Sequence, residues 1–182
     1  FRSSAASDVY KRQSINYVSV CLESGVKYNI FMEDIEDFKK SIGKKSRLLG
    51  IDPGKKRVGI AISDENKLVS TPLKTIIKKN NTNVISDILE IIKENNIKGI
   101  VVGNPINMDG SKGASSQSAK DFAKNLSNNI SIPIVMWDER LSSQGAFNLS
   151  SNLNINTSKK VEKLDQNAAS FILQGAIDYI KR

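Results

Sequence analysis

Apolar and polar positions alternate most clearly between residues 47 and 64, which read RLLGIDPGKKRVGIAISD. The first half is a short apolar run that ends in an acid, Asp52. The second half alternates apolar with small residues, and its apolar positions are Val58, Ile60 and Ile62. Because a period of two is typical of a β-strand, this stretch predicts a buried strand, a turn and a second strand.

The remaining pattern predicts one more strand next to these two, followed by alternating helices and strands. Residues 68–76 form the third strand, in which Pro72 favours an interruption or a sheet edge. Helical spacing predicts an amphipathic helix over 83–95, with Thr82 or Asn83 as its cap. The other predicted elements are strands over 97–103 and 132–137 and helices over 32–42, around 119–126, from Ser142 onward, and from Asp165 to Ile180.

The order of these elements predicts the fold class. Three strands in succession indicate an antiparallel meander, whereas helices alternating with strands indicate parallel crossovers. The order β-β-β-α-β-α-β-α-α therefore predicts one α/β domain, built on a mixed five-stranded sheet with helices on both faces. A chain of 182 residues is long enough for one such domain. We expect residues 47–182 to form it, and residues 32–46 to supply the leading helix and a basic connector.

Residues 1–31 do not share this pattern. The stretch SSAASDVYKRQ, residues 3–13, is what the read-adapter DNA of a common transposon-based sequencing library encodes, and Met32 begins a stretch typical of a natural start. We therefore expect residues 1–31 to be a non-native or disordered N-terminal extension without a chemical role.

The residue types narrow the chemistry. Histidine is absent, and Cys21, within that extension, is the single cysteine. A disulfide framework, a cysteine metal site and a histidine acting as base or zinc ligand are thereby excluded. Any catalysis must use carboxylates, lysines, hydroxyls or a metal.

The net charge of +8 and an isoelectric point near 9.5 favour a polyanionic partner such as nucleic acid. No apolar run approaches the roughly 18 residues that a membrane span needs. The start of the chain also lacks the basic-then-apolar pattern of a signal peptide. We expect a cytoplasmic protein with no membrane partner.

Acidic residues stand where two predicted strands end and where the last helix opens. Asp52 ends the first strand, Asp138 and Glu139 close the run IPIVMWDER, and Asp165 opens the run LDQNAASFILQGAI. Divalent metals prefer such hard oxygen ligands, so these acids are candidates for one shared metal site.

Each acid also has a structural alternative. Asp52 begins Asp-Pro-Gly, which is good turn chemistry, and Asp165 suits a helix N-cap. Asp138 and Glu139 suit a surface pair, or Glu139 an ion pair with Arg140. Because adjacent residues at a strand end face opposite ways, one of the two acids points into the site, and we favour Glu139.

Basic residues beside the acids are candidate phosphate contacts, because guanidinium and ammonium groups bind phosphate oxygens. These candidates are Lys55, Lys56, Arg57 and Arg140. A solvated basic turn is the alternative for the lysines. The loop over 104–113, including Asn107, either holds a nucleic-acid strand or only connects two elements. Trp137 either stacks on a base or belongs to the core.

Four blocks of sequence carry a resemblance to a known family: GIDPGKKRVGIAISD (50–64), IVVGNPINMDGS (100–111), DERLSS (138–143) and LDQNAASFILQ (164–174). In this order they resemble the YqgF/RuvX family of Holliday junction resolvases and pre-16S rRNA nucleases, within the ribonuclease H-like superfamily. The resemblance implies a ribonuclease H-like fold and a nuclease dependent on Mg²⁺ or Mn²⁺. It implies Asp52, Glu139 and Asp165 as catalytic residues, and these with Asp138 as metal ligands.

The resemblance leaves the substrate open between structured RNA and branched DNA, because basic residues read phosphates without reading the sugar. A four-way junction would require a symmetric homodimer with two sites. The main alternative is a catalytically weak nucleic-acid-binding module of the same fold. An ATP-binding protein is the weakest alternative, because that fold needs a duplicated half for which 182 residues leave no room.

Overall fold

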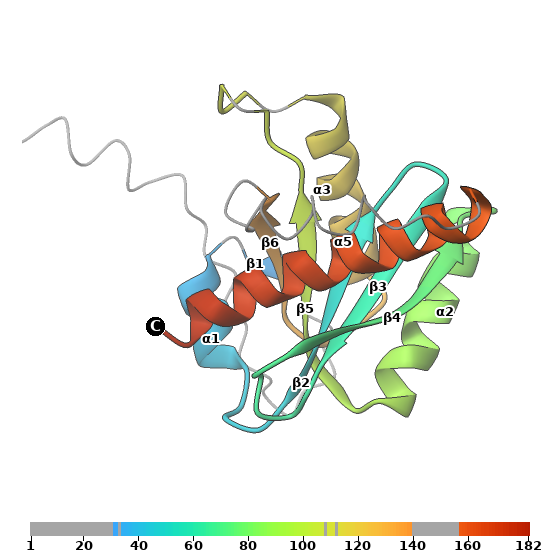
Figure 1. The fold of residues 1–182 in the computed structure, drawn as a ribbon. Coiled ribbons are helices and arrows are strands. Elements are labelled where there is room, and N and C mark those ends of the chain that lie inside the picture. Colours follow the sequence, from blue (N-terminus) through green and yellow to red (C-terminus); the bar gives the residue numbers. More distant parts are fainter. Residues whose placement is uncertain (1–30, 33, 108, 112, 140–156) are drawn as a thin grey trace, which may run out of the picture.

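The computed structural model describes residues 31–32, 34–107, 109–111, 113–139 and 157–182. Within them, one mixed sheet has the strand order β1-β6-β5-β2-β3-β4 and is covered by helices (Figure 1). None of the described helices is both long and apolar enough to cross a membrane. The strands are β1 (Phe31–Met32), β2 (Arg47–Pro53), β3 (Arg57–Ser63), β4 (Ser70–Ile77), β5 (Ile97–Asn104) and β6 (Ile134–Asp138). The helices are α1 (Ile35–Ser41), α2 (Asn81–Glu94), α3 (Ala114–Ser127) and α5 (Thr157–Ile180).

The sheet confirms the predicted fold class. Strands β2, β3 and β4 form the antiparallel meander, and β2, β5 and β6 run parallel to one another. The structure adds one strand to the five predicted. Phe31 and Met32 pair in parallel with Ile134 and Val135 of β6. Two residues carry no measurable periodicity, so this short strand could not be recognised from the sequence.

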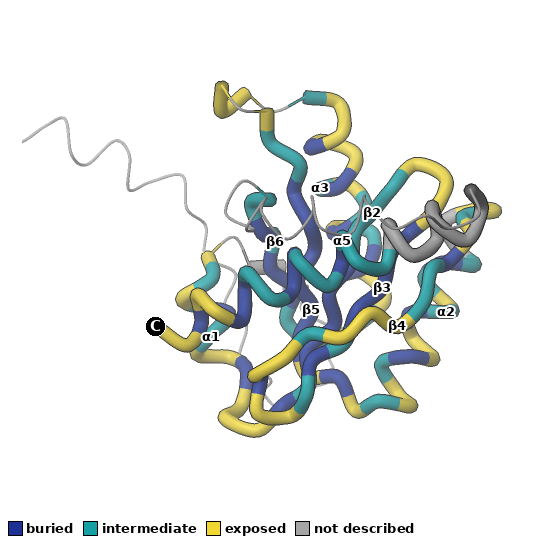
Figure 2. Tube along the Cα trace, viewed as in Figure 1, coloured by how far each residue is buried: buried dark blue, intermediate teal, exposed yellow. Residues whose placement is uncertain are grey.

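Successive residues of the central strands face opposite helical layers, as the pleat of a strand requires. Leu48 packs with α1 and α5, whereas Leu49 packs with α2 and α3. Val101 and Val102 of β5 divide in the same way. The central strands are therefore buried on both sides, while the edge strand β4 is largely exposed (Figure 2). This is the burial that the nearly continuous apolar runs of the sequence predict.

The predicted sheet edge is confirmed at β4. Ile60 of β3 pairs with Lys74, and its neighbour Ala61 pairs with Pro72, so Leu73 is the additional residue of a bulge. Proline lacks a backbone N–H and is tolerated on an edge strand or at a bulge. Both conditions hold here.

The helix boundaries correct two predictions. The N-cap of α2 is Asn80, not Thr82 or Asn83: the Asn80 side chain accepts from the Asn83 N–H at 2.8 Å, and the Asn83 side chain accepts from the Asn80 N–H at 2.9 Å. Helix α5 begins at Thr157, well before Asp165, so Asp165 is not a helix N-cap. The helix predicted from Ser142 lies outside the described residues.

Helix α5 lies across one face of the sheet (Figure 1). It packs tightly against β2 at Gly50. A Cβ placed on Gly50 would lie 2.6 Å from the Leu173 Cβ and 2.9 Å from the Ala169 backbone oxygen. Only a residue without a side chain permits this approach. The contact fixes α5 over the part of β2 that leads to Asp52.

We expect Gly50→Ala to lower the free energy of unfolding by about 1–3 kcal/mol, because the added methyl group meets the backbone of α5, which cannot move locally. Urea unfolding at fixed pH measures this. Gly43→Ala is the matched control, since its Cβ would meet only the Lys45 oxygen at 3.9 Å. Equal stability of the two variants would contradict the close packing of α5 on β2.

Candidate active site

Three parallel strands end at the same edge of the sheet and bring their carboxyl-terminal residues together. Asp52 lies near the end of β2, and Asp138 ends β6, where it pairs with Asn104 of β5. Glu139 follows directly after β6. A Cβ on Gly103 would lie 2.7 Å from Glu139 Oε1. The Glu139 carboxylate therefore lies against the end of β5.

The edge holds a pocket of about 210 Å³. Its lining includes the acids Asp52 and Glu139 and two serines from the first turns of α3. The lining residues are Asp52, Pro53, Gly54, Lys55, Pro105, Ser115, Ser118 and Glu139. Asp52 and Glu139, 87 positions apart in the sequence, thus face one cavity.

The electrostatics of the pocket are dominated by its acids. Burial, and then the negative charges of Asp52 and Asp138, raise the pKa of Glu139 to about 7. Desolvation and like charges both disfavour an ionised carboxylate. A bound cation would relieve this repulsion, so the donor set has the chemistry of a divalent metal site.

Asp165 belongs to α5, which lies over the sheet beside this edge. It precedes Ala169 by about one helical turn, roughly 6 Å along the axis. Its side chain lies outside the described part of the chain. Among the described side chains, no three acids stand close enough together to form a metal site.

Comparison with known proteins decides the family. Residues 46–179 match the family model RuvX, described as "Holliday junction resolvase". The chain belongs to the RuvX family. It is 56% identical over 149 residues to the "Putative pre-16S rRNA nuclease" of Pelagibacter ubique, an alignment that covers 82% of this chain and 99% of that protein. A protein of the same name from Ruegeria sp. is 42% identical over 80% of this chain and 93% of its own length.

Among solved structures, "T. thermophilus RuvC in complex with Holliday junction substrate" aligns with a TM-score of 0.48 and 12% sequence identity. The alignment covers 70% of this chain and 91% of that chain. At this distance the likeness adds nothing to the assignment.

The structure brings together only some of the residues predicted for the site of this RuvX protein. Lys55 lines the pocket. Lys56, on the turn between β2 and β3, and Arg57, the first residue of β3, are exposed. Asp138 is half-buried beside the site without lining the pocket. Arg140 lies outside the described residues.

Asn107 is used within its own loop. Its backbone N–H donates to the Ser111 oxygen at 3.1 Å, and its Nδ2 donates to Ser111 Oγ at 2.9 Å. Trp137 is only 4% exposed and packs its ring edge-on against Tyr179, with ring centroids 5.8 Å apart. Of the two predictions for Trp137, membership of the core is confirmed.

Helix α3 lines part of the pocket, which the sequence pattern did not indicate. Ser115 and Ser118 line the same pocket as the acids. Between them, Ser116 is buried and donates to Asn104 Oδ1 at 2.7 Å, which ties α3 to the end of β5. The sequence did place a helix after the loop that follows a parallel strand, which is where α/β proteins usually bind ligands. That rule places a ligand near the start of the helix, but it does not single out these serines.

Gly103 keeps space for the Glu139 carboxylate in this RuvX site. A Cβ there would lie 2.6 Å from Ile172 Cδ1 and 2.7 Å from Glu139 Oε1, both at the ends of movable side chains. We therefore expect Gly103→Ala to remain folded but to displace Glu139, lowering metal-dependent cleavage on the order of tenfold. Thermal unfolding and a cleavage assay, run side by side, check both parts. Full activity in a folded variant would show that the position of Glu139 is unimportant.

Proposed function

We propose that this protein is a metal-dependent endonuclease that hydrolyses phosphodiester bonds in structured nucleic acid. The observation that carries the proposal is that Asp52 and Glu139 face one pocket, where burial, and then the charges of Asp52 and Asp138, raise the pKa of Glu139 to about 7. Bringing two carboxylates into one partly buried pocket costs free energy, so a purely structural role would not explain the arrangement. Membership of the RuvX family supports the same chemistry.

Asp52 and Glu139 would hold Mg²⁺ or Mn²⁺, with Asp165 from α5 completing the ligand set and Asp138 lying beside it. The chemistry supplied by the bound metal is activation of a water and stabilisation of the charge on the leaving oxygen. By holding the metal, the carboxylates would fix its position relative to the sheet edge. A histidine base is excluded, because the chain contains no histidine.

The substrate would approach over the basic turn and the first turns of α3. Lys55 lines the same pocket as the acids, and Lys56 and Arg57 follow it in the sequence and are exposed. These three side chains would contact the phosphates on either side of the cleaved bond. Ser115 and Ser118 line the same pocket, and their hydroxyl groups can donate hydrogen bonds to phosphate oxygens. The net charge of +8 adds a general attraction to nucleic acid.

We propose precursor 16S ribosomal RNA as the first substrate to test, because the relatives of high identity carry that name. The family description makes a four-way DNA junction the second. A cytoplasmic location belongs to the proposal, and so does a homodimer if the junction is the substrate.

A specific observation favours a second candidate, a nucleic-acid-binding module without useful catalysis. Strand β5 ends in Gly103 and Asn104, where better-characterised resolvases of the superfamily place an acid. The loss of one ligand would weaken a metal site without removing the basic surface.

The deciding experiment incubates the full chain with a labelled precursor 16S RNA fragment and with a labelled four-way DNA junction. Each is assayed with Mg²⁺, with Mn²⁺ and with EDTA. We expect cleavage of at least one substrate in the presence of metal and none in EDTA. Binding of both substrates without cleavage in either metal would establish the binding module instead.

A further inference from the structure

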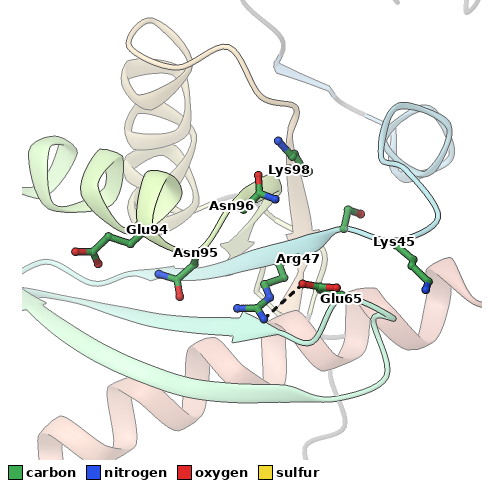
Figure 3. Close-up of a pocket in the computed structure, with 8 residues that line it drawn as sticks. Lys45, Arg47, Glu65, Glu94, Asn95, Asn96 and Lys98 are labelled. Atoms are coloured by element: carbon green, nitrogen blue, oxygen red, sulfur yellow. Dashed lines mark ion pairs between the residues drawn. The ribbon is translucent and has the colours of Figure 1, made fainter.

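A second pocket lies at the opposite end of the sheet from the acids. Its volume is about 320 Å³, and it opens where β2 and β5 begin (Figure 3). Arg47, the first residue of β2, is five positions before Asp52, which separates the two sites by roughly 17 Å along the strand. The lining residues are Lys45, Ser46, Arg47, Glu65, Glu94, Asn95, Asn96 and Lys98.

All eight lining residues are polar or charged, so the pocket suits a hydrophilic ligand better than an apolar one. The basic residues are Lys45, Arg47 and Lys98, against the acids Glu65 and Glu94. Figure 3 shows Glu94 extending away from Arg47, so that Glu65 is the acid beside the guanidinium. The chemistry of the pocket favours a small hydrophilic anion.

Arg47 has unused hydrogen-bonding capacity. Its Nε is buried and has no hydrogen-bond partner in the described part of the chain. Its Nη2 lies 3.6 Å from Glu65 Oε1, longer than the 2.7–2.9 Å typical of a charge-assisted hydrogen bond. The side chain of Glu65 is 62% exposed, so water competes strongly for this pair. Because the Nε atom itself is covered, a ligand in the pocket would contact the terminal nitrogens of the Arg47 guanidinium, whose side chain is 40% exposed.

The wall behind Arg47 is rigidly held. Lys67 is buried, and its ammonium donates to the Gly43 oxygen at 2.8 Å, the Lys44 oxygen at 2.7 Å and Ser46 Oγ at 3.0 Å. Three bonds from one cation fix the segment that leads into β2. A pocket that is preformed loses little entropy when it binds a ligand.

We propose that this pocket binds a phosphate group, with the Arg47 guanidinium as the central donor and Lys45 and Lys98 beside it. Arginine presents a planar set of N–H donors that matches phosphate oxygens. The phosphate comes either from the backbone of a bound RNA or from a free phosphate or mononucleotide. The RNA source rests on the proposed function, whereas the free sources do not.

Amide NMR spectra of the full chain test the proposal with three probes: inorganic phosphate, AMP and a short RNA hairpin. We expect at least one probe to shift the amide signals of residues 45–47, 65 and 94–98. Shifts with phosphate and AMP identify a free ligand, and shifts with the hairpin alone identify a backbone phosphate. No shift at these amides with any probe would overturn the proposal.

Two variants separate ligand binding from a structural role. We expect Arg47→Met to weaken binding of the active probe on the order of tenfold. Glu65→Gln should instead tighten it, roughly twofold to fivefold, because the competing carboxylate is removed. If the Arg47–Glu65 pair only stabilised the local structure, both variants would change the affinity for the probe in the same direction. Lys124→Met, which removes one exposed charge from α3, is the control and should bind like the wild type.

This experiment measures amide shifts and not cleavage. A negative result would therefore contradict the phosphate pocket without contradicting the proposed nuclease function. A chain that binds phosphate at Arg47 and cleaves nothing would support the pocket and contradict the nuclease. A chain that cleaves RNA with unchanged signals at residues 45–47 would do the reverse.

Discussion

Asp52→Asn is expected to lower the rate of metal-dependent cleavage by at least about a thousandfold, with the fold intact. Asparagine keeps the size of the side chain and one oxygen, but it removes the negative charge that a divalent cation requires. Asp52 is half-buried at a strand end and lines the pocket together with Glu139. Single-turnover cleavage of the preferred substrate measures the loss.

The control for this prediction is Asp87→Asn on α2, which makes the same chemical change away from the pocket. It should cleave like the wild type, and both variants should bind the substrate with similar affinity. If Asp52→Asn kept even a tenth of the wild-type rate, the carboxylate mechanism would be wrong.

Glu139→Gln is expected to have two opposite effects. Cleavage should fall on the order of a hundredfold or more, because a metal ligand is lost. The metal-free protein should become more stable at pH 8, by about 1 kcal/mol after discounting for the partial exposure of the side chain. Residues kept for function often lower the stability of the folded protein, so that replacing them by neutral residues raises it.

The sign follows from the pKa. Burial, together with the charges of Asp52 and Asp138, raises the pKa of Glu139 from 4.5 to about 7. Below pH 4.5 the group is protonated in both folded and unfolded chains and costs nothing. As the pH rises towards 7, ionisation favours the unfolded state, and the penalty is complete above 7. Glutamine never ionises.

Unfolding by urea in EDTA at pH 4 and at pH 8 tests this. The variant and the wild type should have similar stability at pH 4, and the variant should be the more stable at pH 8. A variant less stable than the wild type at pH 8 would show that the Glu139 charge is compensated within the folded protein.

The elements of the fold could be predicted because they carry strong periodicity. The runs around Leu48 and Val101 are continuous and apolar, and the structure buries them on both faces. The two-residue strand β1 and the cap at Asn80 were missed because each depends on local geometry without a repeating pattern. The beginning of α5 was misplaced because polar residues precede its apolar stripe.

The candidate site could be predicted only at its strand ends. Asp52 and Glu139 each follow an apolar run, and parallel strands bring such ends together. The contribution of Ser115 and Ser118 depends on how α3 is oriented, which Ser116 and Asn104 fix through a buried hydrogen bond. No pattern along the chain encodes that bond. The pocket at Arg47 was missed for the same reason, because its walls come from three separate turns.

The central claim is that Asp52 and Glu139 bind one divalent metal between them. Titration of the full chain with Mn²⁺, followed by paramagnetic broadening of its amide signals, tests it most directly. We predict that the amide signals of residues 52, 54, 55, 138 and 139 broaden first, and that Asp52→Asn abolishes this at the same Mn²⁺ concentration. Broadening that begins elsewhere, or that persists unchanged in Asp52→Asn, would contradict the account.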